Sequence, residues 1–172
     1  MIIHYTPVDS PLGHLYLAQH TSGLCCLTLG EGAKDKLFAY ISKVYPTAEL
    51  NASEPMLRES VQQLSEYFSG ERTDFSIKLF LSGTDFQKQV WNGLLEIPYG
   101  KTISYGALAT TLNSPGGKRA VGAANGQNPI PIIIPCHRVI AADGSLGGYT
   151  GGLVIKRKLL DLEQQKYTPT LF

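Results

Sequence analysis

The chain has 172 residues, of which 43% are hydrophobic and 17% charged, so it is long enough for one domain or two small ones with a buried core. No apolar run approaches the length of a membrane span, and Met1–Tyr5 lacks the layout of a signal peptide, so we expect no membrane partner. Three cysteines, two of them adjacent, argue against a disulfide framework and for a reducing compartment, which favours a cytoplasmic location.

The formal net charge of +1 hides an asymmetry along the chain. Residues 1–100 carry 7 Lys and Arg against 11 Asp and Glu, whereas residues 101–172 carry 8 against 3. A basic C-terminal part beside an acidic N-terminal part indicates a surface for a polyanion such as a nucleic acid. Enzymes with small anionic substrates would show the same pattern.

The first third of the chain is typical of a small β-sheet. Short apolar runs separated by turn residues predict an antiparallel meander of three strands: Ile2–Val8, His14–His20 and Leu24–Leu29. Two helices follow, over Lys34–Val44 and Pro55–Phe68, and the pattern of Phe75–Leu81 predicts a further strand. We place a domain boundary at Ser82-Gly83, which gives an α/β module over 1–82 and a second domain over 83–172.

The second half begins with signals for helices. Thr84-Asp85-Phe86-Gln87 is a capping box, and apolar residues at helical spacing follow it. Ser104 is placed to cap a second helix over Tyr105–Leu112, and a third is expected over about Lys118–Gly126. Two short helices joined by a tight turn match the layout of a helix-turn-helix, although many helix pairs share it.

The third helix has an unusual composition for a reader of DNA bases. Apart from Arg119, its residues are mostly small, and few could reach base edges in a major groove. A slim helix of this kind could enter a minor groove, with Arg119 as its one long projection. Close packing against a neighbouring helix is the alternative, and without further evidence we favour it.

The run Ile130–Ile134 predicts a buried strand that ends at Pro135-Cys136-His137-Arg138. Thiolate is the reactive form of cysteine, and a neighbouring imidazole is a usual way of generating it. Because Pro135 breaks the strand, a tight turn can bring Cys136 and His137 to one side. This pattern indicates a reactive thiol, and an inert core cysteine is the alternative.

The remaining segments are less specific. A glycine-rich loop over Gly147–Gly152 surrounds one aromatic side chain, Tyr149, and a last helix is expected over Leu153–Gln164. Its basic cluster Lys156-Arg157-Lys158, and Glu163 after it, have the pattern of a solvated helix face. No cysteine or histidine spacing fits a zinc site, so we expect neither a metal nor a cofactor.

The segments from Gly83 to Glu163 together resemble the O6-alkylguanine-DNA alkyltransferases, single-turnover DNA-repair proteins. The N-terminal part fits this family in size and in the order of its strands and helices. The matching motifs are Gly83-Thr84-Asp85-Phe86-Gln87, Val90-Trp91, Ile97-Pro98-Tyr99-Gly100, Ser104-Tyr105-Gly106, Arg119-Ala120-Val121-Gly122, Asn128-Pro129, Pro135-Cys136-His137-Arg138-Val139 and Gly148-Tyr149.

The resemblance implies a fold and catalytic roles. It implies an α/β (α+β) protein, with an RNase H-like N-terminal module on a small antiparallel sheet and a mostly helical, winged helix-turn-helix C-terminal domain. Cys136 would accept the alkyl group irreversibly, His137 would act as a base through a water, Glu163 would orient His137, and Asn128 would brace the reactive turn.

The resemblance also implies how DNA is bound. The helix from Lys118 would enter the minor groove, with Ala120 and Gly122 among its contact residues, and Arg119 would fill the place of the extruded nucleotide. Tyr105 would help to extrude that nucleotide and bind the purine. Tyr149 and Thr150 would belong to the loop over the base.

The implied partner is double-stranded DNA with O6-alkylguanine, bound by a protein that we expect to be a monomer. O4-alkylthymine as a second substrate and cooperative binding along DNA stay open. Two departures from the family pattern lie in the turn before the third helix: Asn113 stands where glycine is more common, and Gly116-Gly117 replaces alanines. The alternatives are a non-catalytic lesion-binding relative, a helix-turn-helix regulator and a cysteine hydrolase.

Overall fold

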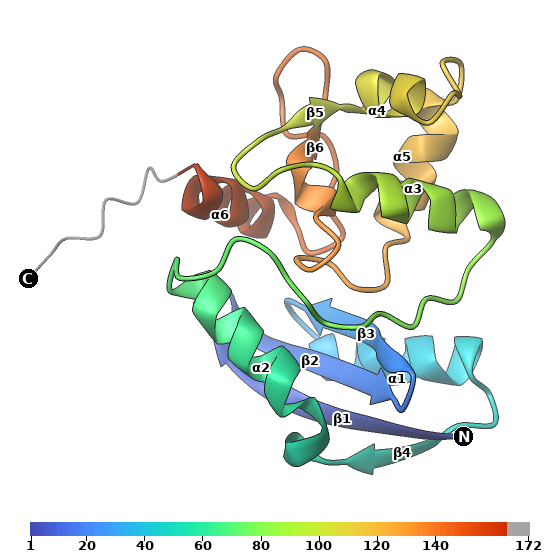
Figure 1. The fold of residues 1–172 in the computed structure, drawn as a ribbon, viewed down its shortest axis with the longest axis vertical. Coiled ribbons are helices and arrows are strands. Elements are labelled where there is room, and N and C mark those ends of the chain that lie inside the picture. Colours follow the sequence, from blue (N-terminus) through green and yellow to red (C-terminus); the bar gives the residue numbers. More distant parts are fainter. Residues whose placement is uncertain (165–172) are drawn as a thin grey trace, which may run out of the picture. The chain divides into compact units, whose positions relative to one another are not determined.

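The computed structural model describes residues 1–164, and these divide into two compact units. The first unit is Met1–Ser82 and the second begins at Gly83. Figure 1 shows a sheet with two helices in the first unit, and mostly helices in the second. The mixed α/β architecture predicted from the sequence is confirmed.

The sheet of the first unit has the strand order β3-β2-β1-β4. Strands β1 (Ile2–Ser10), β2 (Gly13–His20) and β3 (Gly23–Leu29) form the antiparallel meander that the sequence predicts. Strand β4 (Glu49–Ala52) adds a parallel edge beside β1, so the sheet is mixed rather than purely antiparallel. Because β4 is short and largely exposed, it lacks the apolar alternation by which a strand is recognised in a sequence.

Helices α1 (Ala33–Val44) and α2 (Glu54–Phe68) cover opposite faces of this sheet (Figure 1). The strand predicted over Phe75–Leu81 is wrong. Only an isolated bridge forms, in which Leu24 donates its N–H to the carbonyl of Lys78 and accepts from the N–H of Phe80. Because the segment pairs with the edge strand β3 at one residue only, it does not add a strand to the sheet.

The second unit contains four α-helices in its described part: α3 (Asp85–Leu95), α4 (Tyr105–Thr111), α5 (Lys118–Gly126) and α6 (Leu153–Glu163). A two-stranded parallel ladder joins β5 (Ile103–Ser104) to β6 (Val139–Ile140), and β6 follows the 3-10 helix η1 (Cys136–Arg138) directly. The capping box at the start of α3 is confirmed, since both of its reciprocal hydrogen bonds form. Ser104 caps α4 as predicted, by accepting from the N–H of Ala107 at 3.1 Å.

The turn between α4 and α5 explains one departure from the family pattern. Asn113 has a φ of 56°, in the left-handed region that glycine adopts readily and that asparagine tolerates better than most residues. Helix α5 is then held to α3 by Trp91, whose Nε1 donates to the carbonyl of Ala124 at 2.9 Å inside the core. A buried hydrogen bond to α3 therefore holds α5, the second helix of the helix-turn-helix, in place.

The strand predicted over Ile130–Ile134 is also wrong. The run folds into a tight turn in which the N–H of Ile134 donates to the carbonyl of Ile130 at 2.9 Å. Ile132 takes a φ of 76°, which is unfavourable for a β-branched residue. The isoleucines are buried, as they would be in a core strand. Their apolar side chains therefore predicted burial correctly, but they did not indicate the turn.

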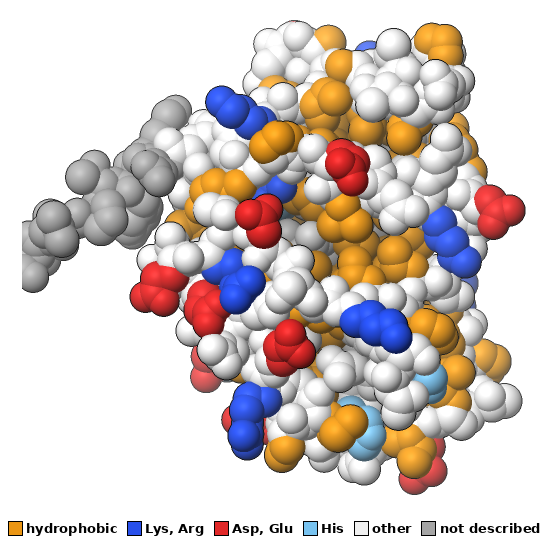
Figure 2. Space-filling view, viewed as in Figure 1, with side chains coloured by type: hydrophobic (Ala, Val, Ile, Leu, Met, Phe, Trp, Pro, Cys, Tyr) orange, Lys and Arg blue, Asp and Glu red, His pale blue; other side chains and the backbone are white. Residues whose placement is uncertain are grey.

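No helix of residues 1–164 is both long and apolar enough to cross a membrane. The charge asymmetry of the sequence does not form a single patch on the face drawn in Figure 2, where Lys and Arg side chains lie among Asp and Glu.

Replacing Trp91 by Phe tests the attachment of α5. The variant loses the donor to the Ala124 carbonyl and part of the ring volume, and we expect the free energy of unfolding to fall by about 2 kcal/mol. Urea denaturation followed by circular dichroism measures it. Leu95→Ala, at a more exposed position of the same helix, should have a much smaller effect, and equal losses for the two variants would refute the assignment.

Candidate active site

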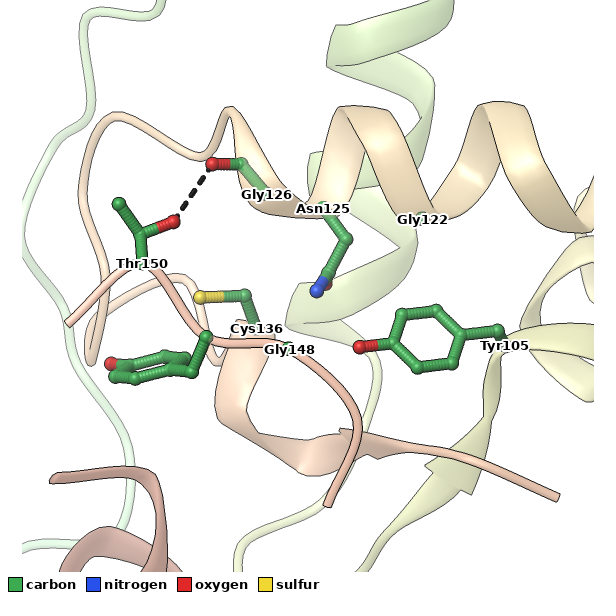
Figure 3. A pocket seen from close by; sticks show the side chains of 8 residues that line it. Tyr105, Gly122, Asn125, Gly126, Cys136, Gly148 and Thr150 are labelled. Carbon is green, nitrogen blue, oxygen red and sulfur yellow. Dashed lines mark hydrogen bonds between the residues drawn. The ribbon is translucent and has the colours of Figure 1, made fainter. Parts of the chain in front are cut away.

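A cavity of about 370 Å³ opens in the second unit beside helix α5 (Figure 3). It brings together five of the residues singled out from the sequence: Tyr105, Gly122, Cys136, Tyr149 and Thr150. The other lining residues are Asn125, Gly126 and Gly148. The thiol of Cys136 lies between the glycine-rich loop and α5, and the Tyr105 hydroxyl points in from the opposite side (Figure 3).

Asn128 closes the turn that carries Cys136. Its Nδ2 donates to the carbonyl of Ile134 at 2.7 Å, and its Oδ1 accepts from the N–H of Ile130 at 2.9 Å. One side chain therefore bonds both ends of the isoleucine turn. Such a clamp helps to hold Ile132 in its strained conformation, a type of strain that is concentrated at functional sites.

Thr150 closes the opposite side of the cavity, because its hydroxyl donates to the carbonyl of Gly126 at 2.9 Å (Figure 3). This bond ties the glycine-rich loop to the C-terminal end of α5. Tyr149 is enclosed more deeply, and its Oη has no hydrogen-bond partner within residues 1–164. Burial raises the pKa of Tyr149 well above its ordinary value, so its hydroxyl keeps its proton.

Cys136 is a buried, protonated thiol at neutral pH. Burial raises its pKa to about 11, against the lowering effects of a hydrogen bond from Asn128 and of the positive charge on Lys156. The sequence suggested a thiolate generated by the adjacent imidazole. The structure instead places the hydrogen-bonding edge of His137 against Glu163, so thiol and imidazole are not a preformed ion pair.

His137 is held as a neutral base. Burial lowers its pKa, and the hydrogen bond with Glu163 only partly opposes this. Nε2 lies 2.6 Å from Oε1 of Glu163, and an ionised carboxylate can only accept, so Nε2 carries the proton. Nδ1 is then the unprotonated nitrogen, and it is buried with no hydrogen-bond partner in the described part of the chain.

Glu163 is the centre of this arrangement. Its carboxylate accepts from His137, from Nε and Nη2 of Arg138 at 2.8 and 3.0 Å, and from the N–H of Gly100 at 3.2 Å. Burial alone would raise the pKa of Glu163, but the hydrogen bonds from His137 and Arg138 outweigh it and lower the pKa to about 2. The prediction from the sequence pattern that Glu163 lies on a solvated helix face is therefore wrong.

Arg138 is a residue of the candidate site to which the sequence analysis gave no role. It is buried, forms a two-pronged ion pair with Glu163, and donates from Nη1 to the carbonyl of Ile97 at 2.5 Å. The turn Ile97–Gly100 thus forms hydrogen bonds with both Arg138 and Glu163. Gly100 is required there, because its φ is 74° and a Cβ would lie 2.9 Å from the carbonyl oxygen of Glu163. The available signal was an arginine directly before the apolar residues Val139-Ile140-Ala141, because an arginine that is buried needs an anion as partner.

Lys156 also lies in the interior, although the sequence placed it on a solvated face. Its side chain is fully buried, and Nζ donates to the backbone carbonyls of Val139, Leu146 and Gly148. The ammonium group therefore ties α6 to β6 and to the loop that lines the cavity. Burial lowers the pKa of Lys156 to about 8, so most molecules carry this charge at neutral pH.

Two of the predicted DNA contacts lie at the start of α5, and a third lines the cavity. Arg119 and Ala120 are exposed near the start of the helix, and Gly122, one turn after Arg119, lines the cavity. One helix thus runs from an exposed arginine to the pocket. Within residues 1–164, no group of three or more His, Cys, Asp or Glu side chains is arranged to hold a metal ion.

We predict that Glu163 stabilises the fold in a pH-dependent way. Its pKa is lowered from 4.5 to about 2, so its contribution is fully present above about pH 4.5 and is lost as the pH falls towards 2. Glu163→Gln leaves Arg138 buried without its counter-charge and should lower the free energy of unfolding at pH 7 by about 3 kcal/mol or more.

Urea denaturation of both proteins at pH 7 and pH 3 measures this effect, and the difference between them should shrink at pH 3. Glu66→Gln, which removes a partly exposed pair with Arg72, serves as a control and should be much milder. A difference that is independent of pH would contradict the prediction.

Comparison with known proteins covers both units. Residues 3–81 match the family described as 6-O-methylguanine DNA methyltransferase, ribonuclease-like domain, and residues 85–165 match the DNA binding domain of the same name. The chain is 48% identical over 165 residues to the methylated-DNA--protein-cysteine methyltransferase of Mycobacterium tuberculosis H37Rv, which covers 96% of this chain and 94% of that protein. It is 45% identical over 161 residues to the Methanosarcina acetivorans protein of the same name, covering 94% of this chain and 98% of that one.

Among solved structures, that of Mycobacterium tuberculosis OGT in complex with DNA is similar with a TM-score of 0.81 and 47% identity, over 94% of this chain and 93% of that chain. The two matched domains together span nearly the whole sequence, and Cys136 of the Pro135–Val139 motif lines a cavity in the second of them. The chain belongs to the 6-O-methylguanine DNA methyltransferase family.

Proposed function

We propose that this protein repairs DNA by transferring the alkyl group of O6-alkylguanine in duplex DNA directly and irreversibly to Cys136. The observation that carries the proposal is a buried thiol in a cavity that is also lined by α5, a helix whose start is exposed. The cavity volume lies in the range of pockets that enclose small ligands. Relatives with this name over nearly the full length, and a related structure with bound DNA, support it.

The base must leave the duplex before it can react. Extrusion of a nucleotide costs a few kcal/mol, and less where the lesion already disturbs pairing. We propose that α5 lies in the minor groove, where exposed Ala120 and the glycine at position 122 permit close approach to the backbone. Arg119 would occupy the vacated place in the stack, and Tyr105 would guide the nucleotide towards the cavity.

The chemical step is a displacement at the alkyl carbon. The Cys136 thiol passes its proton through a bridging water to Nδ1 of neutral His137, whose resulting charge Glu163 stabilises. The bond from Sγ to carbon forms as the bond from carbon to O6 breaks, and its electron pair stays on the guanine. Tyr105 protonates the departing base, then regains a proton from solvent as His137 releases one.

The product explains why each molecule would react once. A thioether has no carbonyl that water could attack, so the acceptor is not regenerated, unlike the acyl-enzyme of a cysteine hydrolase. The presence of the thiol argues against a non-catalytic lesion binder. A helix-turn-helix regulator would not need a thiol-lined cavity beside its recognition helix.

We further propose that residues 1–82 and 83–172 are separate domains, with alkyl transfer confined to the second. We also propose a cytoplasmic location, since Cys25, Cys26 and Cys136 are all free thiols.

Intact-protein mass spectrometry tests the acceptor directly. After incubation with a duplex that contains one O6-methylguanine, the wild-type protein should gain one methyl group, which peptide mapping should place on Cys136. Cys136→Ala should gain none while still binding the duplex. Cys26→Ala, which removes a buried thiol of the first unit, should react like the wild type. Methylation of Cys136→Ala would rule the acceptor out.

The role of Arg119 gives a second prediction. Because the side chain is exposed and fills a gap only in a duplex, Arg119→Ala should slow transfer from double-stranded DNA about tenfold or more and leave the reaction with free O6-methylguanine base nearly unchanged. Arg157→Ala, at an exposed arginine of α6, is the matched control. Single-turnover rates with both substrates measure it, and equal losses with both would refute the role.

A further inference from the structure

The α5 wall of the cavity has one side chain that the proposed mechanism does not use. Gly122, Asn125 and Gly126 recur at helical spacing and line the cavity together. The two glycines contribute only backbone atoms, so the carboxamide of Asn125 is the side-chain functional group that α5 presents in this wall. Its carboxamide points into the cavity, between Cys136 and the hydroxyl of Tyr105 (Figure 3).

Asn125 is buried without full hydrogen bonding. Its exposed fraction is 5%, and Oδ1 has no hydrogen-bond partner in the described part of the chain. Buried amide oxygens are nearly always paired, and those that are not call for an explanation. The neighbouring carbonyl of Ala124 holds Trp91, so the helix cannot rotate to withdraw Asn125 from the cavity. Rotation about χ2 leaves the carboxamide free to present its oxygen to a ligand.

The substrate offers one donor that fits. When O6 of guanine carries an alkyl group, N1 has no hydrogen, and in DNA N9 is bound to the sugar. The 2-amino group is then the only N–H donor left on the base. It lies on the same edge of the purine as O6, so a base whose alkylated O6 faces Cys136 turns its 2-amino group along the same side of the cavity. O4-alkylthymine has no N–H donor at all.

We propose that Oδ1 of Asn125 accepts a hydrogen bond from the 2-amino group of the extruded O6-alkylguanine, and that this contact makes the protein select alkylated guanine over lesions without that group. The inference rests on the proposed function. Pairing of the unsatisfied oxygen in the substrate complex is what gives the selectivity, because a lesion without a donor leaves the oxygen buried and unpaired.

The test compares two duplexes that differ only in the 2-amino group, one with O6-methylguanine and one with O6-methylhypoxanthine. Single-turnover rates are measured for the wild type, Asn125→Ala and Asn125→Leu. The ratio of the two rates corrects for the different intrinsic reactivity of the lesions when it is compared between proteins. We expect this ratio to be about tenfold higher in the wild type than in either variant.

Gln127→Ala is the matched control, since it removes a carboxamide at the exposed end of the same helix outside the cavity, and its ratio should equal that of the wild type. If Asn125→Ala does not fold, Asn125→Leu, whose side chain has the same number and branching of heavy atoms as asparagine, decides alone. Equal ratios in wild type and variant would overturn the inference while leaving alkyl transfer intact. Absence of methyl transfer from either duplex would instead overturn the proposed function.

Discussion

A single buried carboxylate organises the candidate active site of this protein. Glu163 accepts from His137, Arg138 and Gly100, which come from η1 and from the turn after α3, while Glu163 itself belongs to α6. Taking a charge out of water is unfavourable unless donors replace the lost hydration. Here they do, and the same bonds fix the ring of His137 with Nδ1 unprotonated. The geometry of the candidate site and the stability of the fold therefore depend on the same set of contacts.

The charges around the thiol follow from this arrangement. Arg138 balances Glu163, which leaves His137 neutral and able to take a proton. The ammonium of Lys156 is a second buried charge, and its bonds to the Leu146 and Gly148 carbonyls hold the loop that faces Cys136. A thiol that stays protonated at rest is protected from unwanted reactions. This corrects the picture of a preformed thiolate.

The sequence predicted the parts of the fold that local rules control. The capping box of Thr84, the cap of Ser104 and the extent of α5 follow from short-range patterns, and the structure has them. Strand β4 and the course of Phe75–Leu81 depend on pairing between distant segments, which a local pattern does not encode. The strand prediction for the isoleucine run was wrong because a hydrogen bond from the Asn128 side chain to the carbonyl of Ile134, six residues later, closes the run into a turn.

The candidate site shows the same division. The reactive turn was visible because Cys136, His137 and Arg138 are contiguous, and family resemblance added Glu163, Tyr105 and Arg119. Lys156 was predicted to lie on the solvated face, because the sequence of three consecutive basic residues does not show which of them is buried. Asn125 gave no signal in the sequence, and only the structure shows its unpaired oxygen in the lining of the cavity. Burial, rather than residue type, distinguishes these two from their neighbours.

Nitrogen-15 NMR of the histidine rings tests the central claim most directly, since it reports which ring nitrogen of His137 carries a proton. The account predicts a neutral ring at pH 7 with the proton on Nε2 and a bare Nδ1, and a change in this pattern when Glu163 is replaced by Gln. An imidazolium at pH 7, or a proton on Nδ1 alone, would contradict it.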